Sequence, residues 1–253
     1  MADRVDSFTY SGLRHLFTTF ADLGFETRDY WDAHEAPHSI ILRHDCDLSL
    51  TKALKLAEIE FQDHVHATFF VLLRSPFYNV FSLNSIVTLS KIRQFGHEIG
   101  LHFDETAYVD RSNESLVSAI KIEADILSQI IQAPIRTVSM HRPSSSILAA
   151  NLQIPEIENT YSRPYFSDIK YLSDSRMNWR EDPAAFLRSR PTPRCIQILI
   201  HPIWYSNVER TITQALLDFL REVGDERYDD LKDNIRDLST ILSKEQLNEH
   251  FSQ

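Results

Sequence analysis

The segment SIILRHDCD, residues 39–47, decides the fold class. Its apolar run followed by charged side chains is typical of a buried β-strand, and Ser49 can cap a helix that apolar residues then continue at helical spacing. Further expected strands cover 66–73, 97–104, 136–141 and 195–201, and further expected helices cover about 84–95, 112–131 and 208–223. Strands and helices therefore alternate, which predicts an α/β fold with a largely parallel sheet.

Two sections depart from this alternation. The section 144–194 holds five of the ten prolines, so we expect it to be rich in loops, with short strands near 160–166 and 169–172. In the tail beyond Gly224, apolar residues recur at helical spacing: Leu231, Ile235, Leu238 and Leu242. We expect a packed terminal helix there, and a dimerisation helix, which would make the protein a homo-oligomer, is the alternative.

The composition is that of an ordinary globular protein, with 43% hydrophobic and 25% charged residues. We expect a single domain over 1–253, with a motif-bearing core at about 39–204 and C-terminal helices at about 208–250. Lys and Arg number 26 against 36 Asp and Glu, which gives a net charge of −10 without any basic stretch. This charge argues against nucleic acid and anionic membranes as partners.

Sequence signals for a membrane, for export and for disulfides are lacking. No apolar stretch approaches the roughly 18 residues that a membrane-spanning helix needs. The N-terminal residues are charged from Asp3 onward and lack the apolar core of a signal peptide, which favours a cytoplasmic protein. Cys46 and Cys195 are too few for a disulfide framework and lack the spacing of a zinc or redox motif.

Two aspartates lie at the end of the 39–47 strand. Because side chains alternate along a strand, Asp45 and Asp47 share one face, while His44 and Cys46 point to the other. Like charges at this spacing raise the pKa of one carboxyl group unless a cation or metal lies between them, which makes the pair a candidate for function. A structural pair that caps the helix and closes the loop is the alternative.

Three more expected strands end in histidines, which are His102, His141 and His201. In a barrel of parallel strands the carboxyl ends meet at one mouth, so these side chains and the two aspartates can converge there. One aspartate with two histidines suits Zn²⁺, or failing that another first-row divalent ion, and leaves a position for water. A second carboxylate and a further histidine would complete the machinery for hydrolysing an amide or ester.

The motifs that carry these residues resemble those of a known family. HDCD at 44–47, GHEIGLH at 96–102, HRP at 141–143 and LIHP at 199–202 together resemble the polysaccharide deacetylases, the NodB-homology group of carbohydrate esterases. The resemblance spans about residues 39–204. It implies a distorted (β/α) barrel of about seven strands, and a divalent metal that serves the removal of acetyl groups from N-acetylated or O-acetylated sugars.

The resemblance also assigns roles to residues. Asp45 matches the catalytic base, while Asp47 and His102 match two metal ligands. Arg142, in the arginine-proline motif, matches the arginine that orients the base, and His201 matches the general acid.

The sequence departs from the family pattern at two points. Cys46 separates the two aspartates, and Thr106 stands where the family has its second metal-binding histidine. We expect His141 to replace that ligand, because its strand should follow that of His102, and Asp104 is the reserve candidate. His44 and His97 are expected to hold structure.

Aromatic and polar residues near these strand ends are candidates for contacting a sugar: Phe77, Tyr78, Asn79, Trp204 and Tyr205. Packing in the core is an equal alternative for Trp204. The leading hypothesis is a metal-dependent deacetylase, with zinc as the favoured ion, acting on an acetamido sugar or sugar-linked precursor in surface-polysaccharide biosynthesis. The alternatives are hydrolysis of another C–N bond, as in a formamide or cyclic amide, and a carbohydrate-binding protein with a degenerate site, motivated by Thr106.

Overall fold

The computed structural model describes residues 8–33, 36, 38–189 and 193–251. The chain forms two compact units, residues 1–209 and 210–253. The first unit contains every strand found among the described residues, together with the residues of the sequence motifs. The expectation of one domain over the whole chain stays a prediction.

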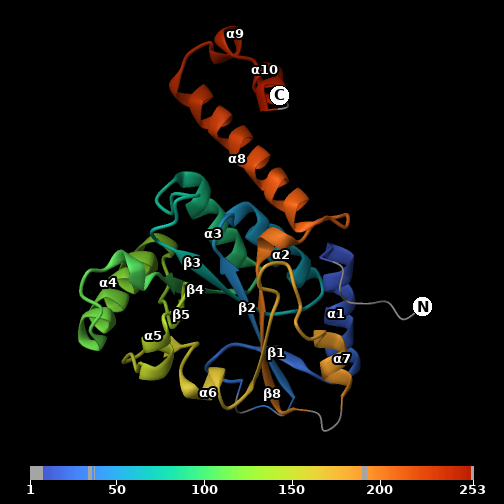
Figure 1. Ribbon diagram of the computed structural model, residues 1–253, viewed down its shortest axis with the longest axis vertical. Helices are drawn as coiled ribbons and strands as arrows, with labels where there is room; N and C mark the ends of the chain where they lie inside the picture. The colour runs from blue at the N-terminus through green and yellow to red at the C-terminus, as the bar shows by residue number, and fades with distance from the viewer. Residues whose placement is uncertain (1–7, 34–35, 37, 190–192, 252–253) are drawn as a thin grey trace. The chain divides into compact units, whose positions relative to one another are not determined.

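The first unit is built on a sheet of eight parallel strands (Figure 1). Seven of them follow one another in the order β6-β5-β4-β3-β2-β8-β7, and β1 pairs with the first half of β2. Their bounds are β1 Glu26–Arg28, β2 Ser39–Cys46, β3 Thr68–Leu72, β4 Glu98–Phe103, β5 Thr137–Met140, β6 Glu158–Asn159, β7 Lys170–Ser173 and β8 Cys195–Ile200. The sheet is curled into a half-barrel, which confirms the expected fold class, although the seven-strand path ends at β6 and β7.

Helices pack on the outer, apolar face of this sheet. Ile40, Leu42 and Cys46 of β2 join the main core, to which α1 to α4 contribute. The helices are α1 Tyr10–Asp22, α2 Leu50–Gln62, α3 Leu83–Gln94, α4 Asn113–Ile131, α5 Ser145–Ala150, α6 Arg163–Phe166 and α7 Pro183–Arg188, with short 3₁₀ helices η1 Glu105–Ala107 and η2 Pro202–Trp204. Ser49 and Ser112 cap α2 and α4 as expected, each accepting a hydrogen bond from a backbone amide three residues on.

The inner face of the half-barrel is much more polar. Ile41 belongs to a small second cluster with Tyr30 and Phe70, and the next residues of β2 on that face are Arg43 and Asp45. Both are buried, so their charges must be satisfied by partners inside the protein.

The loop-rich section contains one wrong strand prediction. Residues 160–166, expected as a strand, include the short helix α6, which begins after Ser162 and has a proline in its first turn. Proline is well tolerated at that position because the first amides of a helix have no intrahelical acceptor. The expected strand near 169–172 is confirmed as β7.

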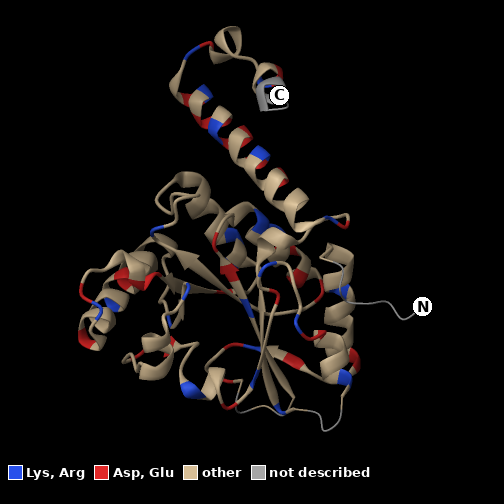
Figure 2. Ribbon diagram, viewed as in Figure 1, with Lys and Arg blue, Asp and Glu red and all other residues tan. Residues whose placement is uncertain are grey.

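The second unit consists of α8 Ile212–Asn234, α9 Leu238–Ile241 and α10 Lys244–Phe251. A capping box between Thr211 and Gln214 begins α8 later than expected, and the helix continues past 223. Charges of both signs alternate along it (Figure 2). The expected single terminal helix is wrong, because Asp237, in the left-handed region at φ 59°, separates α8 from α9. Among the described residues, no helix is long and apolar enough to cross a membrane.

Candidate functional site

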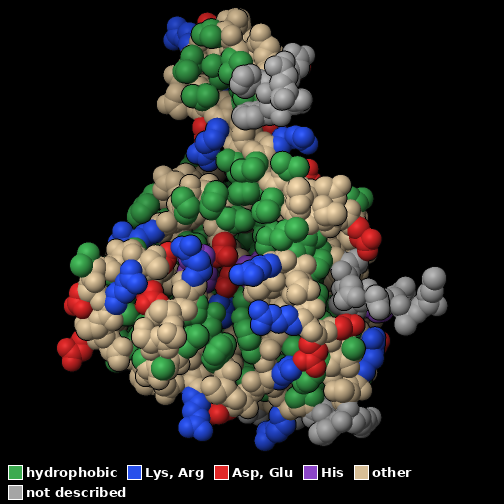
Figure 3. Space-filling view, viewed as in Figure 1, with side chains coloured by type: hydrophobic (Ala, Val, Ile, Leu, Met, Phe, Trp, Pro, Cys, Tyr) green, Lys and Arg blue, Asp and Glu red, His purple; other side chains and the backbone are tan. Residues whose placement is uncertain are grey.

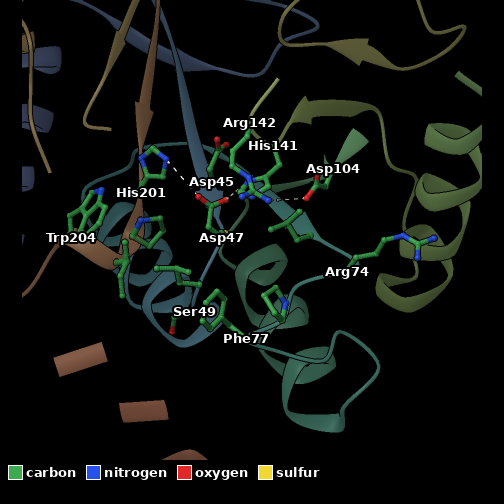
Figure 4. Close-up of a pocket in the computed structure, with 16 residues that line it drawn as sticks. Asp45, Asp47, Ser49, Arg74, Phe77, Asp104, His141, Arg142, His201 and Trp204 are labelled. Atoms are coloured by element: carbon green, nitrogen blue, oxygen red, sulfur yellow. Dashed lines mark hydrogen bonds and ion pairs between the residues drawn. The ribbon is translucent and has the colours of Figure 1, made fainter. Parts of the chain in front are cut away.

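The residues singled out in the sequence gather at the carboxyl ends of the strands. Asp45 lies within β2 and Asp47 just after it, His102 lies within β4, and His141 and His201 directly follow β5 and β8. Apart from the buried His102, these side chains line a cavity of about 310 Å³ (Figure 4). The convergence expected from strand parity is therefore present.

Asp47, His102 and His141 form a tight triangle of ligand atoms. Asp47 Oδ1 lies 3.1 Å from His102 Nε2 and 3.3 Å from His141 Nδ1, and the two ring nitrogens are 3.2 Å apart. A tetrahedral zinc ion with bonds of about 2.0–2.2 Å separates its ligand atoms by about 3.3–3.6 Å. The same Asp47 oxygen is buried without a hydrogen-bond partner of good geometry. The donor set and its spacing therefore fit a divalent metal ion.

The surroundings of His102 prepare it for ligation. Its Nδ1 lies 3.1 Å from the carbonyl oxygen of Ser139, its register partner on β5. Donation of the Nδ1 proton to this carbonyl leaves the Nε2 lone pair directed at Asp47 and His141, which is the usual way in which a second partner orients a metal-binding imidazole. Although burial raises the pKa of Asp47, the proximity of His102 and then of His141 brings it well below its usual value.

The reserve ligand, Asp104, is engaged elsewhere. Its Oδ1 accepts hydrogen bonds from the backbone amide of Thr106 at 2.9 Å and from its hydroxyl at 2.6 Å. Its Oδ2 accepts a hydrogen bond from Arg142. Within the described residues, the cluster that could hold a metal contains His141 and not Asp104.

Asp45 is held by an arginine of its own strand. Arg43 donates two hydrogen bonds of 2.8 Å to the two carboxylate oxygens of Asp45, and Arg43 is fully buried. Thr160 and Tyr161 also accept hydrogen bonds from this guanidinium. Burial raises the pKa of Asp45, but Arg43 and then His102 bring it below its usual value. Asp45 is therefore an oriented, ionised carboxylate 3.6 Å from His102.

Sequence reasoning missed Arg43, although a signal was available. Arg43 lies two residues before Asp45 and therefore on the same face of β2, where a charge pair can form along one strand. The expectation of one raised pKa in the Asp45–Asp47 pair held only where no cation lies nearby, and here Arg43 and the histidines bring the pKa of both carboxyl groups below their usual value.

Arg142 lies in a different place from the one that its motif implies. Its only hydrogen bond among the described residues goes to Asp104, at 3.2 Å, and its side chain is 71% exposed. The backbone turns sharply at this residue, with φ 50°, and Pro143 follows. Arg43, and not Arg142, thus contacts the carboxylate of Asp45.

His201 faces the cavity, and a buried aspartate on the side away from the cavity orients its ring. Its Nδ1 lies 2.6 Å from Oδ1 of the buried Asp174, while its Nε2 lies 3.9 Å from Asp47 Oδ2. Burial lowers the pKa of His201, but Asp174 and, more weakly, Asp45 and Asp47 raise it to about 9. The ring is thus poised to be a proton donor at neutral pH. Sequence reasoning missed Asp174, which directly follows β7, the strand expected at 169–172.

The aromatic candidates divide into two groups. Trp204 and Phe77 line the cavity. Tyr205 is buried, and the Tyr78 hydroxyl links two strand ends, accepting from the Leu72 amide and donating to the Cys46 carbonyl.

Asn79 and the other motif histidines lie away from the cavity. Asn79 accepts a hydrogen bond from the Phe81 amide and shapes its own loop. His44 pairs with Glu60 of α2 at 2.6 Å, and His97 pairs with the carbonyl of Ala57, so both lie on the outer side of the sheet. These positions agree with the structural role expected for the two histidines.

Comparison with known proteins gives similarity in fold. No protein-family model and no curated protein matches the chain. The chitin deacetylase from the fungal pathogen Colletotrichum lindemuthianum is 20% identical over 74% of this chain and 83% of that chain, with a TM-score of 0.46. The peptidoglycan deacetylase PdaC from Bacillus subtilis is 18% identical over 77% and 96%, with a TM-score of 0.43.

A third similar structure is described as a pseudoenzyme. It is BA3943 of Bacillus anthracis, a CE4 family pseudoenzyme, which is 15% identical over 74% of this chain, with a TM-score of 0.41. The match spans 60% of the length of that protein's chain.

Proposed function

We propose that this protein is a metal-dependent hydrolase that removes the acetyl group from an acetamido sugar or a sugar-linked precursor, in the biosynthesis of a surface polysaccharide. The observation that carries the proposal is the triangle of Asp47, His102 and His141, open to a cavity that Asp45 and His201 also line. A divalent ion, most simply Zn²⁺, held there would supply Lewis acidity to the substrate carbonyl and to water.

The two remaining groups fit the two proton transfers of amide hydrolysis. Asp45, kept ionised by Arg43, accepts a proton from the attacking water. His201 donates its Nε2 proton to the nitrogen that leaves as the C–N bond breaks, while Asp174 stabilises the protonated ring. Water adds across the amide, and the products are acetate and the free amine.

Thr106 does not leave the site one ligand short under this proposal. His141 supplies the third ligand atom, so the donor set remains one carboxylate and two imidazoles. Three protein ligands with an open fourth position are typical of catalytic zinc sites, whereas closed four-ligand sites are structural. This argues for the enzyme over the carbohydrate-binding alternative.

Metal content and acetate release test the proposal together. The wild-type protein, purified without added metal, should contain about one zinc or similar ion per chain by elemental analysis, and should release acetate from N-acetylglucosamine derivatives. Asp47→Ala should lose both properties. Asp22→Ala, which changes an exposed aspartate at the end of α1, is the matched control and should keep both. A wild-type protein that holds the ion but releases acetate from none of these substrates would contradict the proposed activity.

A further inference from the structure

The position of Arg142 leads to an inference about the substrate, which rests on the proposed function. Because Arg43 already holds Asp45 with two buried hydrogen bonds, Arg142 is not needed to orient that carboxylate. Arg142 instead lines the cavity mouth next to His141, with its guanidinium directed across to Asp104 (Figure 4).

The guanidinium of Arg142 is anchored by one hydrogen bond and keeps most of its N–H donors available. A guanidinium has five N–H donors, and Arg142 uses one of its terminal nitrogens to bond Asp104. Arg74, the other arginine that lines the cavity, contacts Glu123 and Tyr108 and extends away from the metal ligands (Figure 4). Arg142 is thus the arginine of the lining that retains most of its donors for a ligand.

The backbone around Arg142 is fixed in an unusual conformation. A residue other than glycine at φ 50° is strained by about 1–2 kcal/mol. On one side, the amide of His141 donates to the carbonyl of Phe103 at 2.7 Å, and on the other the amide of Ser144 donates to the buried Glu105 at 2.6 Å. Strain that neighbouring contacts enforce in this way is frequently found where a side chain has a binding function.

Thr106 completes this arrangement. Both its amide and its hydroxyl hold one oxygen of Asp104, so the other oxygen is presented to Arg142. The residue that replaces the expected metal-binding histidine therefore positions the carboxylate that positions the arginine. In the space-filling view, basic side chains lie on both sides of the acidic side chains in the middle of the larger unit (Figure 3).

We propose that Arg142 binds an anionic group of the substrate, a phosphate or a carboxylate, so that the enzyme selects an anionic acetamido sugar over a neutral one. A guanidinium suits both groups, because its parallel N–H bonds match two oxygens of either. The anionic group would lie at the cavity mouth, on the side of His141 and Asp104, when the acetamido group faces Asp45 and His201.

The test compares three ligands on the zinc-loaded protein. N-acetylglucosamine, its 1-phosphate and its uronic acid differ in charge and in the kind of anion. Their binding to Asp45→Asn protein, in which turnover is suppressed, is measured by calorimetry, and kcat/KM for acetate release is measured with Asp45 intact.

Arg142→Gln should weaken the binding of the 1-phosphate or the uronic acid more than that of the neutral sugar. The expected difference is roughly 10-fold to 150-fold, the usual contribution of a hydrogen bond to a charged group. The anion that suffers the larger loss identifies the group recognised. Arg163→Gln is the matched control, because Arg163 is 74% exposed and makes one 3.3 Å contact to Asp168 outside this cavity. Arg163→Gln should leave the binding of all three ligands unchanged.

Two results would overturn the inference. One is that the Asp45→Asn protein, with Arg142 intact, binds the neutral ligand and both anionic ligands equally well. The other is that Arg142→Gln lowers kcat equally for all three substrates and leaves their binding unchanged, as expected for a residue that orients the base. Binding of the 1-phosphate is measurable without turnover, so a protein that binds it through Arg142 but releases no acetate would contradict the proposed function and not this inference.

Discussion

Replacing Arg43 by methionine tests which arginine orients Asp45. The change removes two buried 2.8 Å hydrogen bonds and leaves the carboxylate of Asp45 inside the protein without its main partner. Breaking a buried pair from one side costs about 3–5 kcal/mol. For a chain of this size the melting temperature should therefore fall by about 6–20 °C. Arg142→Met, at an exposed pair, should cost about 0–1 kcal/mol.

The pH dependence of the loss gives a second, independent measurement. Arg43 and His102 hold the pKa of Asp45 below its usual value, so in the wild type Asp45 stabilises the fold above its unfolded pKa of about 3.9, and this contribution is lost as the pH falls through the folded value. Without Arg43, burial and the neighbouring Asp47 should raise the pKa of Asp45. The variant should then be most destabilised near pH 7 and progressively less so as acid protonates Asp45.

Urea unfolding of Arg43→Met and Arg142→Met at pH 7 and at about pH 5 measures the loss of stability and its pH dependence. The pH profile of kcat/KM measures the effect on catalysis. Asp45 must be ionised to act as a base, so a raised pKa should move the acid limb of the Arg43→Met profile to higher pH. Equal destabilisation by the two substitutions, or an acid limb that moves in Arg142→Met and not in Arg43→Met, would refute the assignment.

Three further predictions concern the proton donor, the metal ligands and the base. Asp174→Asn should lower the pKa of His201 from about 9, so the basic limb of kcat/KM should move to lower pH, as a pH–rate profile would record. His102→Ala and His141→Ala should each weaken zinc binding by more than the roughly 10-fold to 100-fold typical of changes behind a ligand, measured by competition with a chelator. Asp45→Asn should keep the zinc while turnover falls roughly 10²-fold to 10⁴-fold, and loss of zinc there would make Asp45 a ligand.

Strand parity predicted most of the site because the side-chain period of a strand is fixed. Once SIILRHDCD was taken as a strand, Asp45 and Asp47 had to share a face, and parallel neighbours brought His102 and His201 to the same edge. His141 required one further inference, the order of the strands, which the pairing of β4 with β5 bears out. Local sequence carries these facts because each ligand lies within one residue of a strand end.

The missed partners depend on contacts that no motif records. Asp174 follows β7, a strand that pairs with β8 across a long excursion of the chain, so its approach to His201 is set by tertiary structure. The helix α1 was missed although a signal was available, because Leu13, Leu16, Phe17 and Phe20 recur at helical spacing. The elements β1 and α6 are only three and four residues long, too short for apolar periodicity to identify them.

A motif's residues can keep their places in the sequence while their contacts are redistributed. Arg43 takes the carboxylate of Asp45 because both lie on the inner face of one strand, where Thr160 and Tyr161 satisfy the rest of the guanidinium. Asp45 is thus oriented through both of its oxygens without a second arginine. Arg142 can therefore face the cavity mouth without loss of orientation at Asp45. Thr106, which is not a metal ligand, holds Asp104, and Asp104 accepts a hydrogen bond from Arg142. Under the proposed function, the contacts of Arg142 and Thr106 favour recognition of a charged substrate group at the cavity mouth, while Asp45 keeps its role as the base.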